Sequence, residues 1–193
     1  MFGIVTKLQQ AGGLVLEKLR ASVWRHRDFR LLWVGALFSF VGSFVQTVAQ
    51  GWLVFELTKS EAMLGLVTFC VSIPVAILGP FAGIMADVKN RRTVLVICQS
   101  IFGCSALFLS LATYQGWVTV NHIIIVSLIL GCVSAFEMPA RQAILSSVVP
   151  IEELPKAIPL NALTFNAARL IGPAVGALLL TKGPALCYLV NGL

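Results

Sequence analysis

The stretch Gly79–Arg92, GPFAGIMADVKNRR, joins two long apolar segments and decides the fold class. Gly79, Gly83 and Asp87 recur every fourth residue, so on a helix they share one face. Glycines on such a face allow a neighbouring helix to approach closely. Basic residues then fill the turn before the second apolar segment begins, at Lys89, Arg91 and Arg92. The pattern predicts a helical hairpin whose connecting turn lies at a membrane surface.

The composition of this 193-residue chain excludes an ordinary soluble domain, because 58% of its residues are apolar and only 11% are charged. The mean hydropathy is +0.92. The apolar residues form blocks of about 20 residues, the length that a helix needs to cross a bilayer. We predict spans near residues 31–55, 62–86, 93–114, 120–142 and 157–180, with a sixth beginning near Pro184. Residues 31–193 are therefore predicted to be an all-α, polytopic membrane helix bundle in contact with the lipid bilayer.

The positions of the basic residues explain the net charge of +6. They precede the first span and fill the turn between the second and third spans, whereas Lys59 and Lys182 lie on the opposite side. By the positive-inside rule, the N-terminus is predicted to be cytoplasmic in a multi-pass protein of the cell (inner) membrane. No nucleic-acid partner is expected. Residues 1–30 lack a signal-peptide cleavage site and are predicted to form a cytoplasmic segment with an interfacial helix.

Isolated cysteine and histidine residues are expected to have structural roles. The cysteines all fall within predicted spans and form no CxxC motif, at Cys70, Cys98, Cys104, Cys132 and Cys187. We expect them to be buried packing residues, and expect no metal site or disulfide framework. His122 stands alone at a predicted interface and is expected to be a solvated surface residue.

A polar stripe runs along the first span, where Ser39, Ser43, Gln46 and Gln50 recur at steps of four, three and four. These steps place the side chains on one helical face. Amides that face lipid are costly unless they meet a partner or water. Two interpretations are open. The stripe lines a water-filled substrate cavity, or it forms hydrogen bonds to a neighbouring helix and stabilises the bundle.

Charged residues also occur inside the predicted spans. Glu137 and Arg141 lie four residues apart and can pair within one helix. They form either a structural ion pair at the membrane edge or a gate or proton-linked pair. Arg169 lies near the middle of the fifth span. A charge there costs about 2.5–3.5 kcal/mol on insertion scales, so Arg169 is expected to face a cavity, a partner such as Glu137, or an anionic ligand.

Two motifs resemble those of the major facilitator superfamily, a twelve-helix transporter fold with two six-helix halves. Residues 83–92, GIMADVKNRR, are similar to the family's loop motif between helices two and three. The matching residues are Gly83, Asp87, Arg91 and Arg92, while Val88 and Asn90 depart from the pattern. Gly172, Pro173 and Gly176 resemble the helix-five motif of antiporters in this superfamily. Residues 28–33, 56–60 and 138–142 look like the branch that contains the enterobactin exporter and related bacterial efflux permeases.

The resemblance implies that the chain is the N-terminal six-helix half of a secondary active transporter, truncated in helix six. Such a protein would export a small-molecule substrate by alternating access and proton antiport, with the proton gradient as energy source and no cofactor. Gly83 would make a close helix contact, and Asp87 with Arg91 a cytoplasmic ion-pair lock. Gly172, Pro173 and Gly176 would shape helix five against the other half. The substrate-cavity candidates are Ser39, Gln46, Gln50 and Arg169, and the ion-pair or proton candidates are Glu137 and Arg141.

Two other classes of function are weighed against transport. The chain stops within its sixth span, so the missing C-terminal half or a second copy is an expected partner. The alternative is a truncated or half-size membrane protein that acts as a non-transporting scaffold or as a homodimeric half-transporter. Catalysis is not expected, because the sequence contains no HExxH, no GxSxG, no metal-ligand cluster and no phosphate-cradling loop.

Overall fold

The computed structural model describes residues 24–88 and 90–193, with side chains described except at 84–88. These residues form helices without any strand: α2 (Arg27–Thr58), α3 (Glu61–Val88), α4 (Arg91–Tyr114), α5 (Val120–Val148), the 3-10 helix η1 (Ile151–Glu153), α6 (Leu154–Leu180) and α7 (Pro184–Gly192). Five helices are long and apolar enough to cross a membrane. The predicted all-α membrane bundle is thus confirmed. The interfacial helix expected within residues 1–30 falls mostly outside the described residues.

The helices extend beyond the predicted spans because polar and basic residues at their ends continue the same helical turns. The largest difference is in α5, which runs to Val148 instead of ending near residue 142. Prolines do not end the helices that contain them, at positions 74, 80, 139, 159 and 173. Membrane helices tolerate such prolines because neighbouring helices, hydroxyl side chains or water form hydrogen bonds with the carbonyls that proline leaves without a partner.

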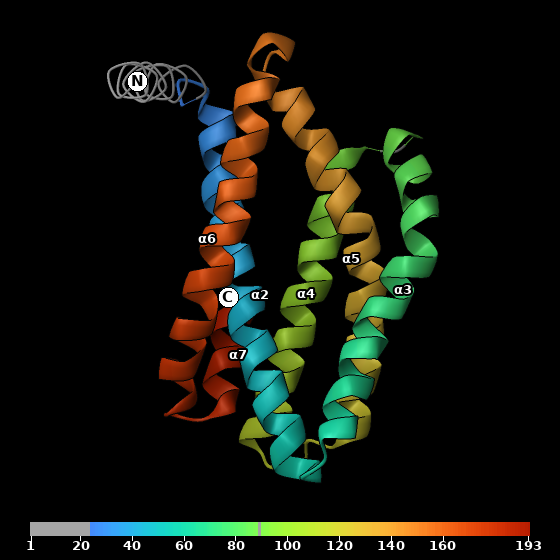
Figure 1. The fold of residues 1–193 in the computed structure, drawn as a ribbon, viewed down its shortest axis with the longest axis vertical. Helices are drawn as coiled ribbons and strands as arrows, with labels where there is room; N and C mark the ends of the chain where they lie inside the picture. The colour runs from blue at the N-terminus through green and yellow to red at the C-terminus, as the bar shows by residue number, and fades with distance from the viewer. Residues whose placement is uncertain (1–23, 89) are drawn as a thin grey trace, which may run out of the picture.

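The helices form an elongated bundle in which successive long helices run in opposite directions (Figure 1). The closest pairings are α3 with α5, α2 with α6, and α4 with α7, and contacts of α4 with α5 and of α2 with α7 join these pairs. The short helix α7 ends at mid-height, beside α2 (Figure 1). Helices distant in sequence therefore surround the middle of α2.

Glycines allow the close approach of two of these pairs. A Cβ atom added to Gly131 of α5 would collide with the carbonyl oxygen of Val71 in α3 and would lie 3.1 Å from Pro74 Cγ. A Cβ atom added to Gly172 of α6 would collide with the Cβ atom of Phe44 in α2. Small residues let helix backbones approach in membranes, where no hydrophobic force drives helices together.

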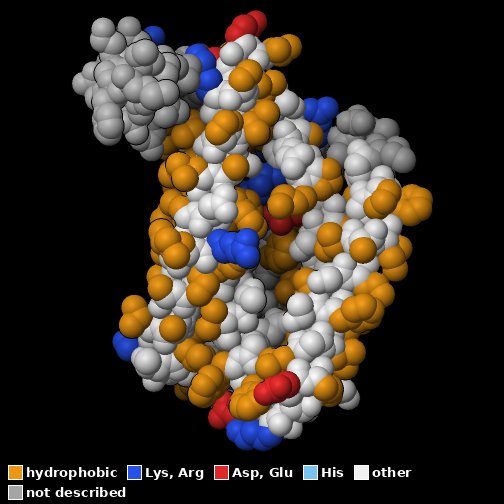
Figure 2. Space-filling view, in the orientation of Figure 1, with side chains coloured by type: hydrophobic (Ala, Val, Ile, Leu, Met, Phe, Trp, Pro, Cys, Tyr) orange, Lys and Arg blue, Asp and Glu red, His pale blue; other side chains and the backbone are white. Residues whose placement is uncertain are grey.

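Apolar side chains fill the interior and also cover the outside. The largest core cluster joins α2, α3, α4, α5 and α7 and includes Val45, Leu53, Leu109, Ile123 and Tyr188. Many large apolar side chains are nevertheless exposed, including Phe38 at 73% and Leu170 at 79%. Figure 2 shows apolar side chains along the sides of the bundle and charged ones mainly at its ends. This distribution fits a protein whose sides face lipid.

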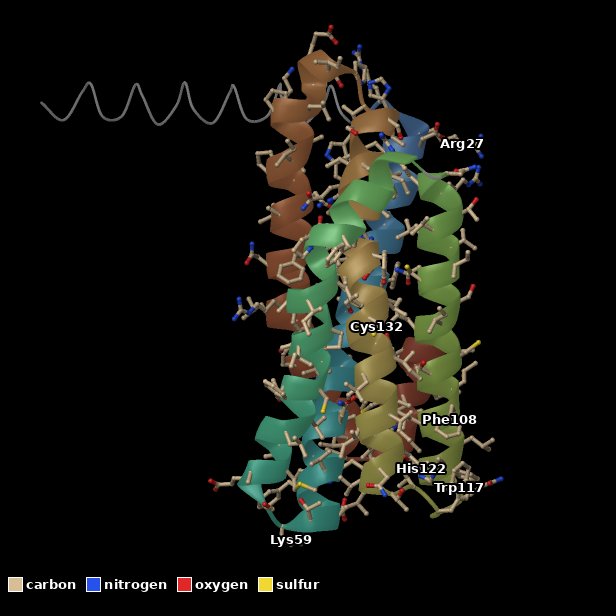
Figure 3. The ribbon with its side chains drawn as sticks, turned by 90° about the vertical axis from the view of Figure 1, so that its right-hand side faces the viewer. Arg27, Lys59, Phe108, Trp117, His122 and Cys132 are labelled. Carbon is tan, nitrogen blue, oxygen red and sulfur yellow. The ribbon has the colours of Figure 1, made fainter. Side chains whose placement is uncertain are left out.

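The two ends of the bundle differ in chemistry. Arg27 lies at one end, and Lys59 lies at the other with a cluster of Phe108, Trp117 and His122 (Figure 3). The His122 ring Nδ1 accepts a hydrogen bond from the Thr119 backbone N–H at 3.2 Å, and the ring centroid lies 5.3 Å from that of Trp117. His122 is half-buried and its hydrogen bond to Thr119 is exposed, so it lies at the surface as expected, where its ring caps the first turn of α5.

Burial separates the cysteines into two groups. Cys70, Cys98 and Cys187 are buried, as predicted, whereas Cys104 is exposed and Cys132 is half-buried. Cys104 lies on a face of α4 that no described helix covers. The prediction of buried packing is therefore wrong for Cys104.

Candidate functional site

An ion pair lies in the interior of α5. The Arg141 Nη2 atom donates to the Glu137 Oε1 atom, and the two side chains are only 6% and 14% exposed. Residues four apart on a helix are neighbours, which explains the pairing. The predicted pair is thus confirmed as a contact. Its burial exceeds that expected of a surface ion pair.

The carboxylate of this pair belongs to a chain of hydrogen bonds across three helices. The Gln99 Nε2 atom of α4 donates to Glu137 Oε1 at 2.9 Å. The Ser39 hydroxyl of α2 donates to Gln99 Oε1 at 3.2 Å. Glu137 thus accepts from α4 and from α5, and α2 is joined to it through Gln99. Sequence reasoning missed Gln99, although a single amide in the middle of an apolar span was an available signal.

Arg141 lies between this carboxylate and an aromatic ring. Its guanidinium carbon is 4.6 Å from the centroid of the Phe40 ring of α2, and its buried Nε atom has no hydrogen-bond partner among the described residues. A buried cation is stabilised here by one carboxylate and one π face. Among the described residues, Glu137 is the only acidic partner of Arg141, so protonation of Glu137 would leave the Arg141 guanidinium without a counterion.

The two glutamines of the polar stripe contact neighbouring helices. Gln46 is 5% exposed, and its Oε1 atom accepts from the Asn191 side chain of α7 at 2.5 Å. The Gln50 Nε2 atom donates to the Ser127 hydroxyl of α5 at 2.9 Å. Gln46 is therefore a bundle contact and not part of a cavity wall in this structure. Of the two interpretations of the stripe, hydrogen bonding to other helices describes both glutamines.

The serines of the stripe have different environments. Ser39 is half-buried in the chain of hydrogen bonds described above. Ser43 is exposed and donates to the Ser39 carbonyl of its own helix, and Thr47, one turn further, is exposed and donates to the Ser43 carbonyl. Between Arg30 and Glu56, the exposed polar surface of α2 thus consists of Ser43 and Thr47. Thr47 was not predicted, because its one-residue offset from Gln46 removed it from the stripe.

Arg169 is exposed near the middle of α6. No described residue forms a hydrogen bond or ion pair with its guanidinium. Glu137, one of its expected partners, pairs with Arg141 instead. The remaining expectations for Arg169 are a cavity or an anionic ligand.

The loop motif lies at the end of the bundle where α3 ends and α4 begins. Gly83 is exposed, and a Cβ atom there would meet no described atom within 4 Å, so the expected close helix contact is not made among the described residues. The Asp87 side chain lies outside the described residues. Arg91 Nη1 donates to the Ala143 carbonyl of α5 at 3.0 Å, whereas the Arg92 side chain is exposed. Arg91 therefore links α4 to α5.

The helix-five motif packs within this half. Gly172 and Gly176 are buried against α2, with a Gly176 Cβ position 3.3 Å from Val45 Cα. Pro173 is half-buried beside them. The two glycines therefore shape the contact of α6 with α2, and the expectation that they face the other half is corrected by this packing.

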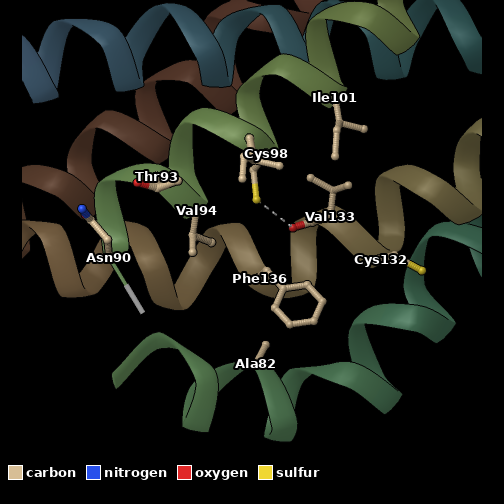
Figure 4. Close-up of a pocket in the computed structure, with 10 residues that line it drawn as sticks. Ala82, Asn90, Thr93, Val94, Cys98, Ile101, Cys132, Val133 and Phe136 are labelled. Atoms are coloured by element: carbon tan, nitrogen blue, oxygen red, sulfur yellow. Dashed lines mark hydrogen bonds between the residues drawn. The ribbon is translucent and has the colours of Figure 1, made fainter. Parts of the chain in front are cut away.

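An apolar cavity of about 540 Å³ lies among α3, α4 and α5 (Figure 4). Its wall includes Cys98, whose Sγ atom lies 3.8 Å from the Val133 carbonyl oxygen, and Phe136, which faces Ala82 across the space. The lining residues carry no charge, and none is a predicted substrate-cavity residue. In the described part of the chain, no cluster of His, Cys, Asp and Glu has the geometry to hold a metal ion.

Comparison with known proteins reveals similar transporters. The family described as "transmembrane secretion effector" matches residues 21–193. The chain is 28% identical to the staphyloferrin A transporter of Staphylococcus aureus, over 78% of this chain and 40% of that protein. It is 26% identical to macrolide efflux protein A of Streptococcus pyogenes, over 78% of this chain and 37% of that protein. It is 30% identical to multidrug resistance protein 2 of Bacillus subtilis, over 61% of this chain and 28% of that protein.

The matches cover less than half of each relative, so this chain spans 40% of the staphyloferrin A transporter and less of the other two. No solved structure matches the chain.

Proposed function

Because the chain belongs to the transmembrane secretion effector family, we propose that it forms the N-terminal half of a secondary active exporter of the major facilitator type. The exporter moves a small molecule out of the cell by alternating access, coupled to proton entry, and is not an enzyme. It belongs to the branch of bacterial efflux permeases that contains the enterobactin exporter. Its C-terminal half completes the substrate cavity.

The observation that carries this proposal is the buried carboxylate of Glu137. In the part of the chain with described side chains, the other acidic residues lie near helix ends or in η1, whereas Glu137 lies inside α5. Ionisable groups inside a membrane frequently mark proton or substrate pathways. Glu137 accepts hydrogen bonds from Gln99 and Arg141, so its charge state is coupled to contacts among α2, α4 and α5.

Proton binding at Glu137 supplies a mechanism of coupling. When Glu137 is ionised, its carboxylate holds Gln99 and Arg141 and links α4 to α5. When it is protonated, the carboxyl group loses its attraction for the Arg141 guanidinium, whose Nε atom has no hydrogen-bond partner in the described part of the chain. Arg141 then requires another anion or water, which favours a rearrangement of these helices. Two such charge states are what a proton-driven change of access requires.

An efflux assay of the complete gene product tests the proposal. Cells that lack their main efflux pumps express the protein and are exposed to a panel of siderophores, macrolides and dyes. We expect lower accumulation of at least one compound, and loss of that effect when an uncoupler collapses the proton gradient. Glu137→Gln should abolish efflux with normal membrane insertion, while Glu61→Gln, at an exposed helix start, serves as the matched control. Wild-type efflux in the Glu137→Gln variant would exclude its role as proton carrier.

The loop motif supplies a second element of the mechanism. We assign Asp87 and Arg91 to an ion-pair lock on the cytoplasmic side, with Gly83 available for contact with the other half. The hydrogen bond from Arg91 to the Ala143 carbonyl supports this role, since it already joins α4 to α5 at that end. Asp87→Asn should reduce transport with little loss of membrane insertion. Unchanged transport would remove Asp87 from the mechanism.

A homodimeric half-transporter, or a scaffold, is the second candidate. The exposed glycine face of α3 favours it, because Cβ positions at Gly79 and Gly83 meet no described atom within 4 Å and a second helix could approach there. The two candidates are distinguished by expressing residues 1–193 alone with Gly79→Cys. Spontaneous cross-linking into dimers that still export a compound supports the homodimer. A monomeric, inactive product supports the need for a C-terminal half.

A further inference from the structure

The exposed surface of α6 divides into two strips of different chemistry. One strip is large and apolar, with exposed fractions of 53% for Leu163, 79% for Leu170 and 72% for Leu178. The other strip carries small or polar residues at steps of four, three, four and four: Ala162, Asn166, Arg169, Pro173 and Ala177. A helix that contacts lipid on one side and a different medium on another shows this division. The strip with Arg169 therefore faces away from the acyl chains.

The position of the strip relative to α2 supports the same conclusion. α6 contacts α2 through Ala168, Gly172 and Gly176, and the strip lies next to this contact on the helical surface. On α2, the exposed residues Ser43 and Thr47 lie one residue before and three residues after Phe44, whose Cβ atom contacts the Gly172 position. α2 and α6 run in the same direction (Figure 1), and their polar residues lie on opposite rotational sides of the contact on the two helices, so both polar surfaces lie on one side of the pair. In Figure 2, basic and acidic side chains lie at about mid-height beside a hollow on this face of the bundle.

Arg169 cannot reach either end of the bundle. It lies 11 residues before Leu180 and 15 residues after Leu154, which corresponds to about 16 Å and 22 Å along a helix. An arginine side chain is too short to carry its charge over such distances to the headgroups. In lipid, the charge would cost about 2.5–3.5 kcal/mol or more. Arg169 therefore requires water and an anion at mid-height.

The interior charge is unbalanced in the part of the chain that the structure describes. Away from the helix ends, the charged residues there are Glu137, Arg141 and Arg169. Glu137 and Arg141 neutralise each other, which leaves Arg169 as an unmatched positive charge. An arginine presents paired N–H donors that match a carboxylate in a bidentate arrangement.

We propose that Arg169 binds a carboxylate of the exported substrate, which makes this protein an exporter of anionic small molecules. The inference rests on the proposed function and specifies its substrate class. Arg169 is a binding residue on the wall of the cavity, with Asn166 and the α2 hydroxyl groups of Ser43 and Thr47 beside it. Binding of the anion completes the charge balance in the middle of the bundle.

Cysteine chemistry tests the environment of Arg169 without any transport. Asn166→Cys is introduced, one helical turn from Arg169, in the complete gene product with its native cysteines replaced by alanine. We expect water-soluble methanethiosulfonates to react there, the anionic sulfonate faster than the cationic ammonium reagent by about tenfold, because a cationic cleft concentrates anions. Arg169→Gln should remove that preference. Ile171→Cys is the control, since Ile171 is 47% exposed on the side of α6 away from Asn166 and Arg169, and it should react with neither reagent.

Two labelling results would overturn the proposal. If Asn166→Cys reacts with neither reagent, the strip faces lipid. If the preference persists in Arg169→Gln, the field comes from other groups. Both results are independent of whether the protein exports anything, so they are distinct from a failure of the proposed function.

Transport of two dyes tests the substrate class. Cells are loaded with anionic carboxyfluorescein and cationic ethidium. We expect the ratio of carboxyfluorescein export to ethidium export to fall about tenfold in Arg169→Gln and less in Arg169→Lys, since only the latter retains a charge. Lys182→Gln, the same charge change at the end of the bundle, is the control. Export of ethidium but not of carboxyfluorescein by the wild type would overturn the anionic class and leave the exporter function intact.

Two further outcomes complete the transport test. An equal loss of both dyes in Arg169→Gln would assign Arg169 to the moving parts of the protein and overturn its role in recognition. Export of neither dye by the wild type would count against the proposed function, and the cysteine chemistry would still decide what Arg169 faces.

Discussion

Breaking the Glu137–Arg141 pair should have effects on stability that are strongly non-additive. We consider Glu137→Gln, Arg141→Gln and the double variant, which remove one charge or both. Glu137→Gln keeps the side-chain volume, whereas Arg141→Gln shortens the side chain. The Arg141 side chain is 6% exposed and that of Glu137 is 14% exposed, so either single change leaves a buried charge without its counterion. Removal of one member of a buried pair typically costs about 3–5 kcal/mol.

The remaining contacts determine where in this range each variant falls. In Glu137→Gln, Arg141 retains the Phe40 ring at 4.6 Å, which contributes about 0.5–2 kcal/mol. In Arg141→Gln, Glu137 retains the Gln99 donor, which limits the loss. We therefore expect each single variant to lower the free energy of unfolding by about 3 kcal/mol. The double variant should lose less than the sum of the two by about 2 kcal/mol or more, because no uncompensated charge is left.

These free energies are measured by unfolding the purified protein in mixed micelles with an increasing fraction of dodecyl sulfate. Tryptophan fluorescence monitors the unfolding. Ser146→Ala, at an exposed position in α5, serves as the control and should be close to wild type. The reasoning is refuted if the effects of the single variants add within about 0.5 kcal/mol, the agreement usual for independent sites. Additivity would mean that water or another group, and not the partner, compensates each charge.

Three further predictions concern packing and topology. Gly131→Ala should destabilise the protein by about 1–3 kcal/mol, because its Cβ meets the α3 backbone. Gly65→Ala, with open space around it, should be neutral or stabilising. Equal thermal stabilities of the two variants would contradict the close packing of α5 against α3. Asn191→Leu should lower the free energy of unfolding in micelles by about 0.6–2 kcal/mol, because the buried Gln46 amide of α2 loses its hydrogen-bond partner. Wild-type stability of this variant would show that the contact is weak. In intact cells, an impermeant maleimide should label Lys59→Cys but label Arg27→Cys only after permeabilisation, and the reverse pattern would invert the topology.

The sequence determined the class of this protein because the bilayer imposes a simple requirement on a chain. Every backbone polar group within lipid needs an internal partner, so apolar blocks of about 20 residues must be helices. The hairpin at 79–92 and the distribution of basic residues then indicated how the helices are connected. The pairing of Glu137 with Arg141 was equally accessible, since it depends only on the spacing of four residues within one helix.

Only the tertiary structure decided which neighbour each helical face meets. Ser39, Gln46 and Gln50 share one stripe in the sequence, yet they bond to three different helices, α4, α7 and α5. Gly172 likewise appeared available to the other half but lies against α2. Helical periodicity defines the faces of a helix, whereas the partner of each face depends on how helices far apart in the chain cross one another. For that reason the charge on Arg169 was visible in the sequence, and its lack of a partner among the described residues became visible only in the folded bundle.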